Sequence, residues 1–76
     1  MIDIASVPLN AAAWIGAAGS AQARMTTAMG TAIGSLTAQD RLSTAEDMER
    51  AAEEGRDAAF ALLVAAAIVR AGGPLA

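Results

Sequence analysis

Two long stretches of the chain carry the hydrophobic pattern of helices, and a short polar segment separates them. Residues 11–38 are mostly Ala, Gly, Ser and Thr with larger apolar residues at helical spacing, and Arg24 is their only charge. Residues 43–71 begin with a charged half and end with an almost wholly apolar half. The connection, 39–42, is so short that the two helices must run antiparallel. We therefore predict an all-α fold in one domain, an antiparallel helical hairpin of two long Ala-rich helices.

Local sequence signals mark the ends of both helices. Asn10 is a suitable N-cap for the first helix. Ser43, with Glu46 three residues later, matches a capping box for the second helix, in which the hydroxyl and the carboxylate satisfy first-turn amides. Residues 1–10 are predicted to form an extended lead, and residues 72–76, with their Gly-Gly-Pro run, a tail that follows the helix stop.

The hairpin also predicts which residues meet across it. With the turn centred near Arg41, Arg24 should lie near Asp57 and form an ion pair. Arg70 should lie near Trp14 and stack on its ring. An ordinary solvated arginine is the alternative at either position.

The inner face of the second helix is predicted to be a seam of mostly small residues. Its positions recur with alternating gaps of four and three, which is the heptad pattern of packed helices. Small residues at these positions let helix axes approach closely. The seam consists of Met48, Ala52, Gly55, Ala59, Leu62, Ala66 and Val69.

The first helix carries a row of small residues of its own. Gly30 and Gly34 form a GxxxG pair, and Gly16 and Ser20 continue the small-xxx-small spacing, which favours close contact between helix backbones. The alternative is a composition bias that places Ala and Gly wherever they are tolerated. With the seam of the second helix, these residues form the predicted assembly interface. The apolar stripe of the first helix is Ile15, Ala18, Met25, Met29, Ile33 and Leu36.

The composition predicts that one copy of the chain has a thin core. Hydrophobic residues make up 55% of the 76, but 22 of them are alanine and only 15 are Leu, Ile, Val or Phe. Burying a methyl group stabilises a fold far less than burying a branched side chain. Association with further copies would cover the remaining apolar surface. We therefore expect the hairpin to pack in a larger homo-oligomeric assembly, with other helical proteins as alternative partners.

Several classes of chemistry are excluded by the residues that the chain lacks. It contains no Cys and no His, so no Ser/His or Cys/His nucleophile arrangement can form. Glu46, Glu49 and Glu53 share related turns, but the histidines of carboxylate metal bundles are missing. A net charge of −3 and five scattered arginines argue against nucleic acid as a partner. We expect no enzymatic activity, no cofactor, no metal and no catalytic residue.

The sequence offers no confident membrane span. Residues 4–23 are uncharged but contain Pro8 and Asn10, and the apolar run 58–69 is far shorter than the ~20 residues that a bilayer requires. Contact with a membrane during assembly stays open. The amino terminus also lacks the basic start of a secretory signal peptide, which predicts a signal-independent route if the protein is exported.

The layout of the chain resembles the needle and pilus subunits of type III secretion systems. The small-residue first half, WIGAAGSAQARMTTAMGTAIGSL, is most similar to the plant-associated Hrp-type pilins. The acidic segment LSTAEDMERAAEEGRDAAF occupies the place where that family begins its carboxy-terminal helix. The resemblance implies a self-assembling subunit of a helical filament or tube, an extracellular appendage whose second helix lines the lumen.

Two other functions fit the same surfaces. One is a structural component of a virion, such as a phage tail or capsid hairpin. The other is a small scaffold or regulatory module, with a cytoplasmic location, that buries its alanine seam on a different protein.

Overall fold

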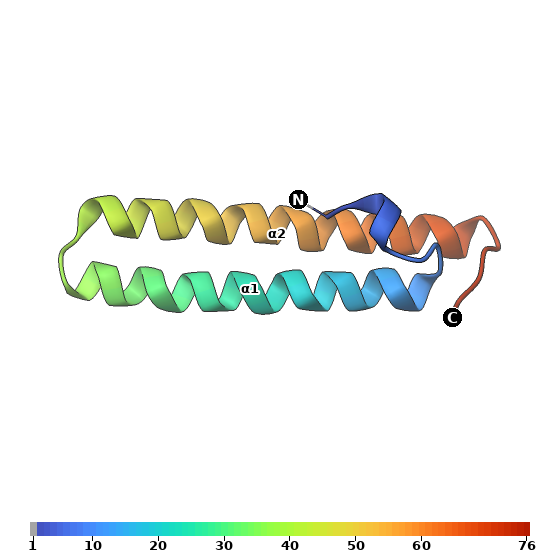
Figure 1. Ribbon diagram of the computed structural model, residues 1–76, viewed down its shortest axis with the longest axis horizontal. Coiled ribbons are helices and arrows are strands. Elements are labelled where there is room, and N and C mark those ends of the chain that lie inside the picture. The colour runs from blue at the N-terminus through green and yellow to red at the C-terminus, as the bar shows by residue number, and fades with distance from the viewer. Residues whose placement is uncertain (1) are drawn as a thin grey trace.

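The chain forms a helical hairpin, as predicted. The computed structural model describes residues 2–76, which form a short 3₁₀ helix η1 (Ile4–Ser6) and two long helices, α1 (Ala11–Thr37) and α2 (Arg41–Arg70). The two long helices pack side by side and antiparallel in a rod of 50 × 19 × 14 Å (Figure 1). The all-α hairpin is thereby confirmed, and α1 begins at the expected residue and ends one residue earlier than expected.

The turn differs from the prediction and starts α2 two residues earlier. Gln39 takes a left-handed conformation with φ 60°. The Asp40 N–H then donates to the Ser35 carbonyl at 2.9 Å, which closes the end of α1. The Asp40 carboxylate accepts the Ser43 N–H at 3.1 Å and is the N-cap of α2. The predicted Ser43 capping box is wrong because Asp40 already satisfies this amide, so Ser43 lies inside the helix.

Alanines fill the contact between the helices. The buried residues recur at gaps of three, four or their sums, so the helices meet along heptad seams. On α1 these are Ala11, Trp14, Ala18, Ala21, Ala28 and Ala32, and on α2 they are Asp47, Ala51, Ala61 and Ala65.

The predicted inner seam of α2 is therefore displaced by one residue. Met48 is 60% exposed, Leu62 52% and Val69 51%. Ala52, Ala59 and Ala66 are also exposed, and Gly55 is half-buried. The physical reason is size, because a seam of methyl groups lets the two backbones approach, whereas Met, Leu and Val would hold them apart. As the inner face of the hairpin this seam is wrong; as a surface for other copies it stays a prediction.

The predictions of the apolar stripe of α1 and of the two residue pairs across the hairpin are also wrong. Of the predicted stripe only Ala18 is buried and Met25 half-buried, while the remaining members are exposed. Arg24 pairs with Glu54 at 2.9 Å rather than with Asp57. The ring partner of Trp14 is Phe60, edge-on with centroids 6.0 Å apart, and not Arg70. Glu54 lies three residues before Asp57, so a shift of about one helical turn accounts for the first pair. Phe60 lies ten residues before Arg70, a displacement that is larger than this shift.

Both chain ends fold onto the open end of the hairpin. Asn10 caps α1 as predicted by accepting the Ala13 N–H at 2.7 Å. The tail supplies the other acceptors, since the carbonyls of Pro74 and Leu75 accept the N–H groups of Ala11 and Ala12 at 3.0 and 2.9 Å. Gly72, with φ +74°, permits this reversal.

The lead is not fully extended, because it contains η1. The Asp3 carboxylate accepts the Ala5 N–H at 3.0 Å and caps this short helix. Ile2 and Val7 are half-buried against the cluster around Trp14. Met1, the first residue of the predicted lead, lies outside the described residues.

Candidate assembly surface

The hairpin leaves most of its large apolar side chains outside. Among the described residues, Trp14 is the one large side chain that is fully buried. The exposed large apolar residues are Ile4, Leu9, Ile15, Met29, Ile33, Leu36, Leu42, Met48, Phe60, Leu62, Leu63, Val69 and Leu75. A folded monomer normally places such side chains inside. The distribution of these residues over the surface is therefore the main clue to function.

One side of the rod carries no charge from its open end as far as Ala45, and Arg41 lies at the turn end of this side. We call it the uncharged flank and define it by the helix positions that lie beside the buried seams on one side. On α1 they are Ala12, Ile15, Gly19, Gln22, Thr26, Met29, Ile33 and Leu36; on α2 they are Ala45, Met48, Ala52, Gly55, Ala59, Leu62, Ala66 and Val69. Seven of the thirteen exposed large apolar residues lie here. The seam predicted for α2 lies wholly within this flank.

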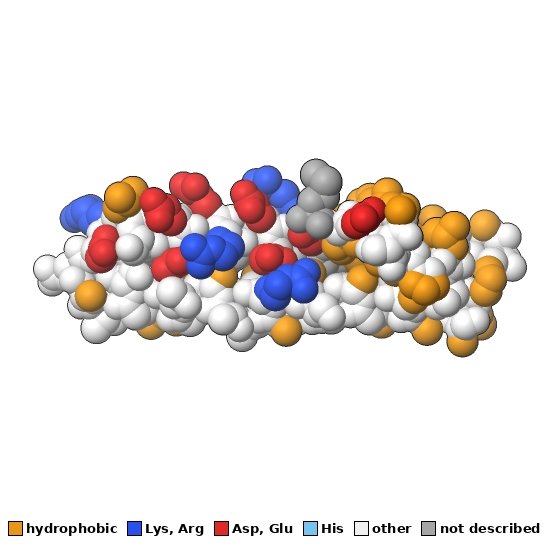
Figure 2. Space-filling view, viewed as in Figure 1, with side chains coloured by type: hydrophobic (Ala, Val, Ile, Leu, Met, Phe, Trp, Pro, Cys, Tyr) orange, Lys and Arg blue, Asp and Glu red, His pale blue; other side chains and the backbone are white. Residues whose placement is uncertain are grey.

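The opposite flank is polar, and the lead covers part of it. Figure 2 shows acidic and basic side chains gathered there over α2 and between the helices, in the half towards the turn. They include the Arg24–Glu54 pair, which is partly exposed and contributes at most about 1 kcal/mol. Towards the open end the lead crosses the same face (Figure 1). Figure 2 also shows apolar side chains on this face towards the open end. The uncharged flank differs in that its apolar character continues along most of both helices.

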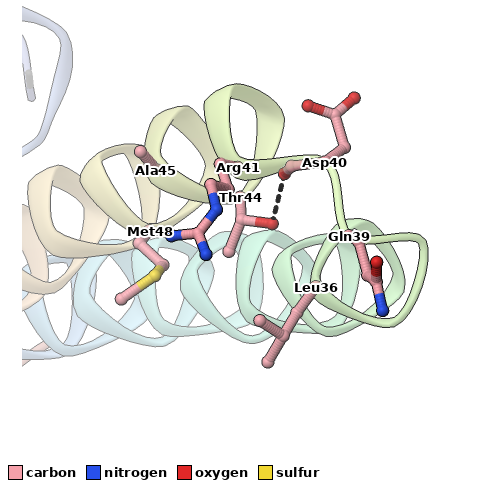
Figure 3. Close-up of a pocket in the computed structure, with 7 residues that line it drawn as sticks. All are labelled: Leu36, Gln39, Asp40, Arg41, Thr44, Ala45 and Met48. Atoms are coloured by element: carbon pink, nitrogen blue, oxygen red, sulfur yellow. Dashed lines mark hydrogen bonds between the residues drawn. The ribbon is translucent and has the colours of Figure 1, made fainter.

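A groove deepens the uncharged flank near the turn. It encloses about 420 Å³ and is lined by Met29, Ala32, Ile33, Leu36, Thr44, Met48 and Ala51. Leu36, Thr44 and Met48 also line a second hollow of about 610 Å³ at the turn itself, where Arg41 and Asp40 add polar groups (Figure 3). The groove has an apolar wall from each helix, so an apolar side chain is the group that fits it.

The predicted glycine row of α1 plays no part in packing the hairpin. Gly16, Ser20, Gly30 and Gly34 are exposed, and a Cβ built on any of the three glycines meets nothing within 4 Å. The close helix contact is made by alanines on another side of α1. The role of this row as an interface with other copies stays a prediction.

Sequence reasoning missed one buried charge. Asp47 is 6% exposed in the seam, accepts the Ser35 hydroxyl at 3.2 Å and pairs with Arg50 at 3.1 Å. Its place in the heptad with Ala51 was the available signal, but an acidic residue in a charged stretch indicates solvent exposure. A single polar group in an otherwise apolar seam favours one register. Asp47 is thus a structural residue.

The described part of the chain offers no other chemistry around which to build a site. Residues 2–76 contain no group of three or more acidic, His or Cys side chains arranged to hold a metal ion. None of the described helices is long and apolar enough to cross a bilayer. No family model, curated protein or solved structure matches the chain. Surface properties therefore carry the functional argument.

Proposed function

We propose that this protein is a structural subunit that assembles with copies of itself into an extended particle such as a filament or tube. The observation that carries the proposal is the uncharged surface, which covers one flank and continues over the outer side of α1. Arg24 is the only charge of α1, and it points to the polar flank, where it meets Glu54. A helix in solvent would ordinarily carry Glu and Lys on its outer face.

The energetics of the isolated hairpin favour association. Its seam consists mostly of alanine methyl groups, whereas Ile33, Leu36 and Leu62 remain more than half exposed. Burying apolar surface contributes roughly 25 cal/mol per Å². Covering these side chains with another copy would therefore bury larger apolar groups than the methyl groups of the intramolecular seam. Association would stabilise the fold by mass action and make its stability depend on concentration.

More than one neighbour is needed to cover this surface. The uncharged flank and the glycine row of α1, which includes Gly16 and Gly30, face different directions. A subunit that offers two such surfaces can contact neighbours on two sides, and contacts that do not close on themselves generate filaments. In the form implied by the resemblance to needle and pilus subunits, the particle is a surface appendage whose subunits are exported by a signal-independent route.

Electron microscopy of the purified chain across a concentration series, together with light scattering, tests the proposal. We expect uniform long particles whose mass per length is constant and whose number rises with concentration. Gly30→Leu, which has room in the monomer, should leave the hairpin helical and reduce particle growth if the glycine row is one of the contacts. A helical monomer or dimer that never elongates would overturn the proposal. A saturable complex with a different protein would favour the scaffold function instead.

A further inference from the structure

We propose that two copies of this chain pack through the uncharged flank in antiparallel orientation, about a two-fold axis at the level of Gly55. This inference rests on the proposed function and names the first contact of the assembly. The pair would be a four-helix arrangement in which α1 lies on α1 of the second copy and α2 on α2. In such an interface each residue meets its counterpart at the same distance on the other side of the axis.

The size and charge of the flank fit a second copy. The rod is 50 Å long and 19 Å wide, so one of its long sides is large enough to bury the ~800 Å² per partner of a stable protein interface. A partner that is complementary to an uncharged, apolar face must itself be uncharged and apolar over a similar length. The flank of a second copy meets both requirements over most of its length, because its positions on α1 and those from Ala45 to Val69 on α2 carry no charge and Arg41 lies only at its turn end.

The middle of the rod is fixed by contacts across the hairpin. Arg24 and Glu54 pair at 2.9 Å, and a Cβ built on Gly55 would lie 3.1 Å from the Met25 sulfur. Arg24 on α1 and Gly55 on α2 are therefore at about the same level. Both also lie near the midpoints of their helices. A single axis at this level can relate both helices to those of a second copy.

Reversal about this level brings large residues of α1 against small ones. Leu36 and Ala12 lie equally far from Arg24 along the sequence, and so do Met29 and Gly19. Each copy therefore sets Leu36 and Met29 opposite the smallest residues of the other copy. The remaining large pair, Ile33 with Ile15, is likewise equidistant from Arg24, so Ile15 of the second copy reaches the level of the groove.

The pattern of α2 has the same symmetry. Met48 and Leu62 lie equally far from Gly55, and Ala52 and Ala59 flank it on either side. The backbones can approach most closely at the axis, where the side chains are small. Leu62 of the second copy then reaches Met48 in the wall of the groove.

A parallel pair would fit less well. It would place groove on groove at one end and the exposed side chains of Ile15, Leu62 and Val69 against one another at the other end. The antiparallel pair instead fills each groove with side chains from the opposite end of the second copy. Shape complementarity of this kind distinguishes specific interfaces from adventitious contacts.

Disulfide trapping tests the orientation directly, because the chain contains no cysteine of its own. Two variants, Met48→Cys and Leu62→Cys, are prepared separately, mixed and exposed to a mild oxidant. In the antiparallel pair residues 48 and 62 of different copies are adjacent. Residues 48 and 48 are about 21 Å apart along the helix axis, beyond the ~7 Å between Cα atoms that a disulfide spans. We expect the mixed disulfide to exceed either homodimer by at least fivefold.

A matched control uses the same sequence spacing outside the flank. Glu49→Cys and Arg56→Cys are also seven residues apart, but both are exposed on the outer, charged side of α2. Their mixture should form homodimers and mixed dimers in statistical proportion. All four substitutions replace exposed side chains, so circular dichroism should show an unchanged hairpin in each variant.

The outcomes separate this inference from the proposed function. Assembly without preferential trapping of residues 48 and 62 overturns the antiparallel flank contact alone. Dominant Met48→Cys homodimers overturn it as well, because residue 48 would then lie next to its own counterpart and not next to residue 62. A chain that stays monomeric at every concentration overturns both proposals. Preferential mixed disulfides for both 48 with 62 and Ile15→Cys with Ile33→Cys would establish the pair.

Discussion

Two neighbouring rows of residues on α2 have almost the same sequence pattern, but one row is buried and the other is largely exposed. The first row contains Asp47, Ala51, Ala61 and Ala65 and is buried against α1. The second row is one residue further along, from Met48 to Val69, and is largely exposed on the uncharged flank. Both rows repeat with heptad spacing and both are rich in alanine. The difference lies in the large apolar residues: the first row has one only at its open end, where Ile68 packs against the Trp14 cluster, whereas Met48, Leu62 and Val69 are spread along the second row.

The comparison separates two uses of small residues. In the buried row, alanine sets the distance between two helices of one chain, and Trp14 fills the space that the methyl groups leave at one end. In the exposed row, alanine and glycine leave grooves between the larger side chains of Met48, Leu62 and Val69. The side chains of a further helix can pack into these grooves. The first row thus serves the fold, and the second row serves the assembly that we propose.

Replacing one alanine by leucine in each row should give the largest difference in the free energy of unfolding between the two rows. Ala61 is fully buried against Trp14, so Ala61→Leu should force the helices apart and lower the free energy of unfolding by about 3 kcal/mol. Ala59→Leu adds the same atoms on the exposed row and should change it by less than about 0.5 kcal/mol. Urea unfolding followed by circular dichroism measures both. Equal destabilisation would mean that the two rows do not differ in packing.

A charge on the second row should affect assembly without affecting the fold. Leu62→Glu places a carboxylate in the middle of the open half of the flank, where a second copy would have to desolvate it. We expect the concentration for half-maximal assembly to rise at least tenfold while the helical signal of dilute protein is unchanged. Leu63→Glu, one residue away on the outer side of α2, is the control. A similar rise for both variants would contradict a contact specific to the flank.

The fold was predictable to the extent that its signals are local. Asn10, the polar link and the lengths of the apolar runs predicted the hairpin because caps and periodicity act within a few residues. The inward row was not predictable, since Ala52 and Ala59 are as small as Ala51 and Ala61. Only the partner surface on α1 distinguishes them. Asp40 and Ser43 likewise offered two competing caps, and the left-handed Gln39 decided between them.

The candidate surface was likewise predictable only in the properties that do not depend on how the two helices pack. The shortage of branched residues predicted that one copy would leave apolar surface uncovered, because this follows from composition alone. The place of that surface on the hairpin depends on which row of α2 faces α1, and the predicted inner seam lies one residue away from the buried row. Met48, Leu62 and Val69 were therefore singled out, but as a seam within the hairpin. Asp47 was missed because its burial is a property of the register and not of the local charge pattern.

The buried carboxylate of Asp47 in the first row should contribute more to the free energy of unfolding than the exposed carboxylate of Glu46. Asp47→Asn keeps the size of the side chain but weakens its hydrogen bond with Ser35 and removes the ion pair with Arg50. Hydrogen bonds to charged groups are the stronger ones, so we expect a loss of about 1 kcal/mol in the free energy of unfolding. Glu46→Gln, at an exposed position one residue earlier, is the matched control and should have no effect. Equal denaturation midpoints for the two variants would contradict a structural role for Asp47.

The smallest expected effect concerns the turn, which fixes the row of α2 that faces α1. The pKa of the Asp40 carboxyl lies below its ordinary value, chiefly because the Ser43 backbone N–H donates to the carboxylate and also because the Ser43 side chain does. A group whose pKa is lowered by folding binds its proton more readily in the unfolded chain. Its contribution to stability is therefore present above the unfolded pKa and is lost as the pH falls through the folded pKa.

Asp40→Asn isolates this contribution, because asparagine can still cap α2 but does not titrate. We expect the wild-type chain to be slightly more stable than Asp40→Asn at neutral pH, and the difference between them to shrink as the pH falls below the ordinary aspartate range. The measurement is the urea midpoint of dilute protein as a function of pH, taken as a difference so that the other carboxylates cancel. A difference that stays constant down to strongly acidic pH would show that the Asp40 charge does not hold the turn. The early start of α2 would then rest on the left-handed Gln39 and on the hydrogen bond from Asp40 to Ser35 that closes α1.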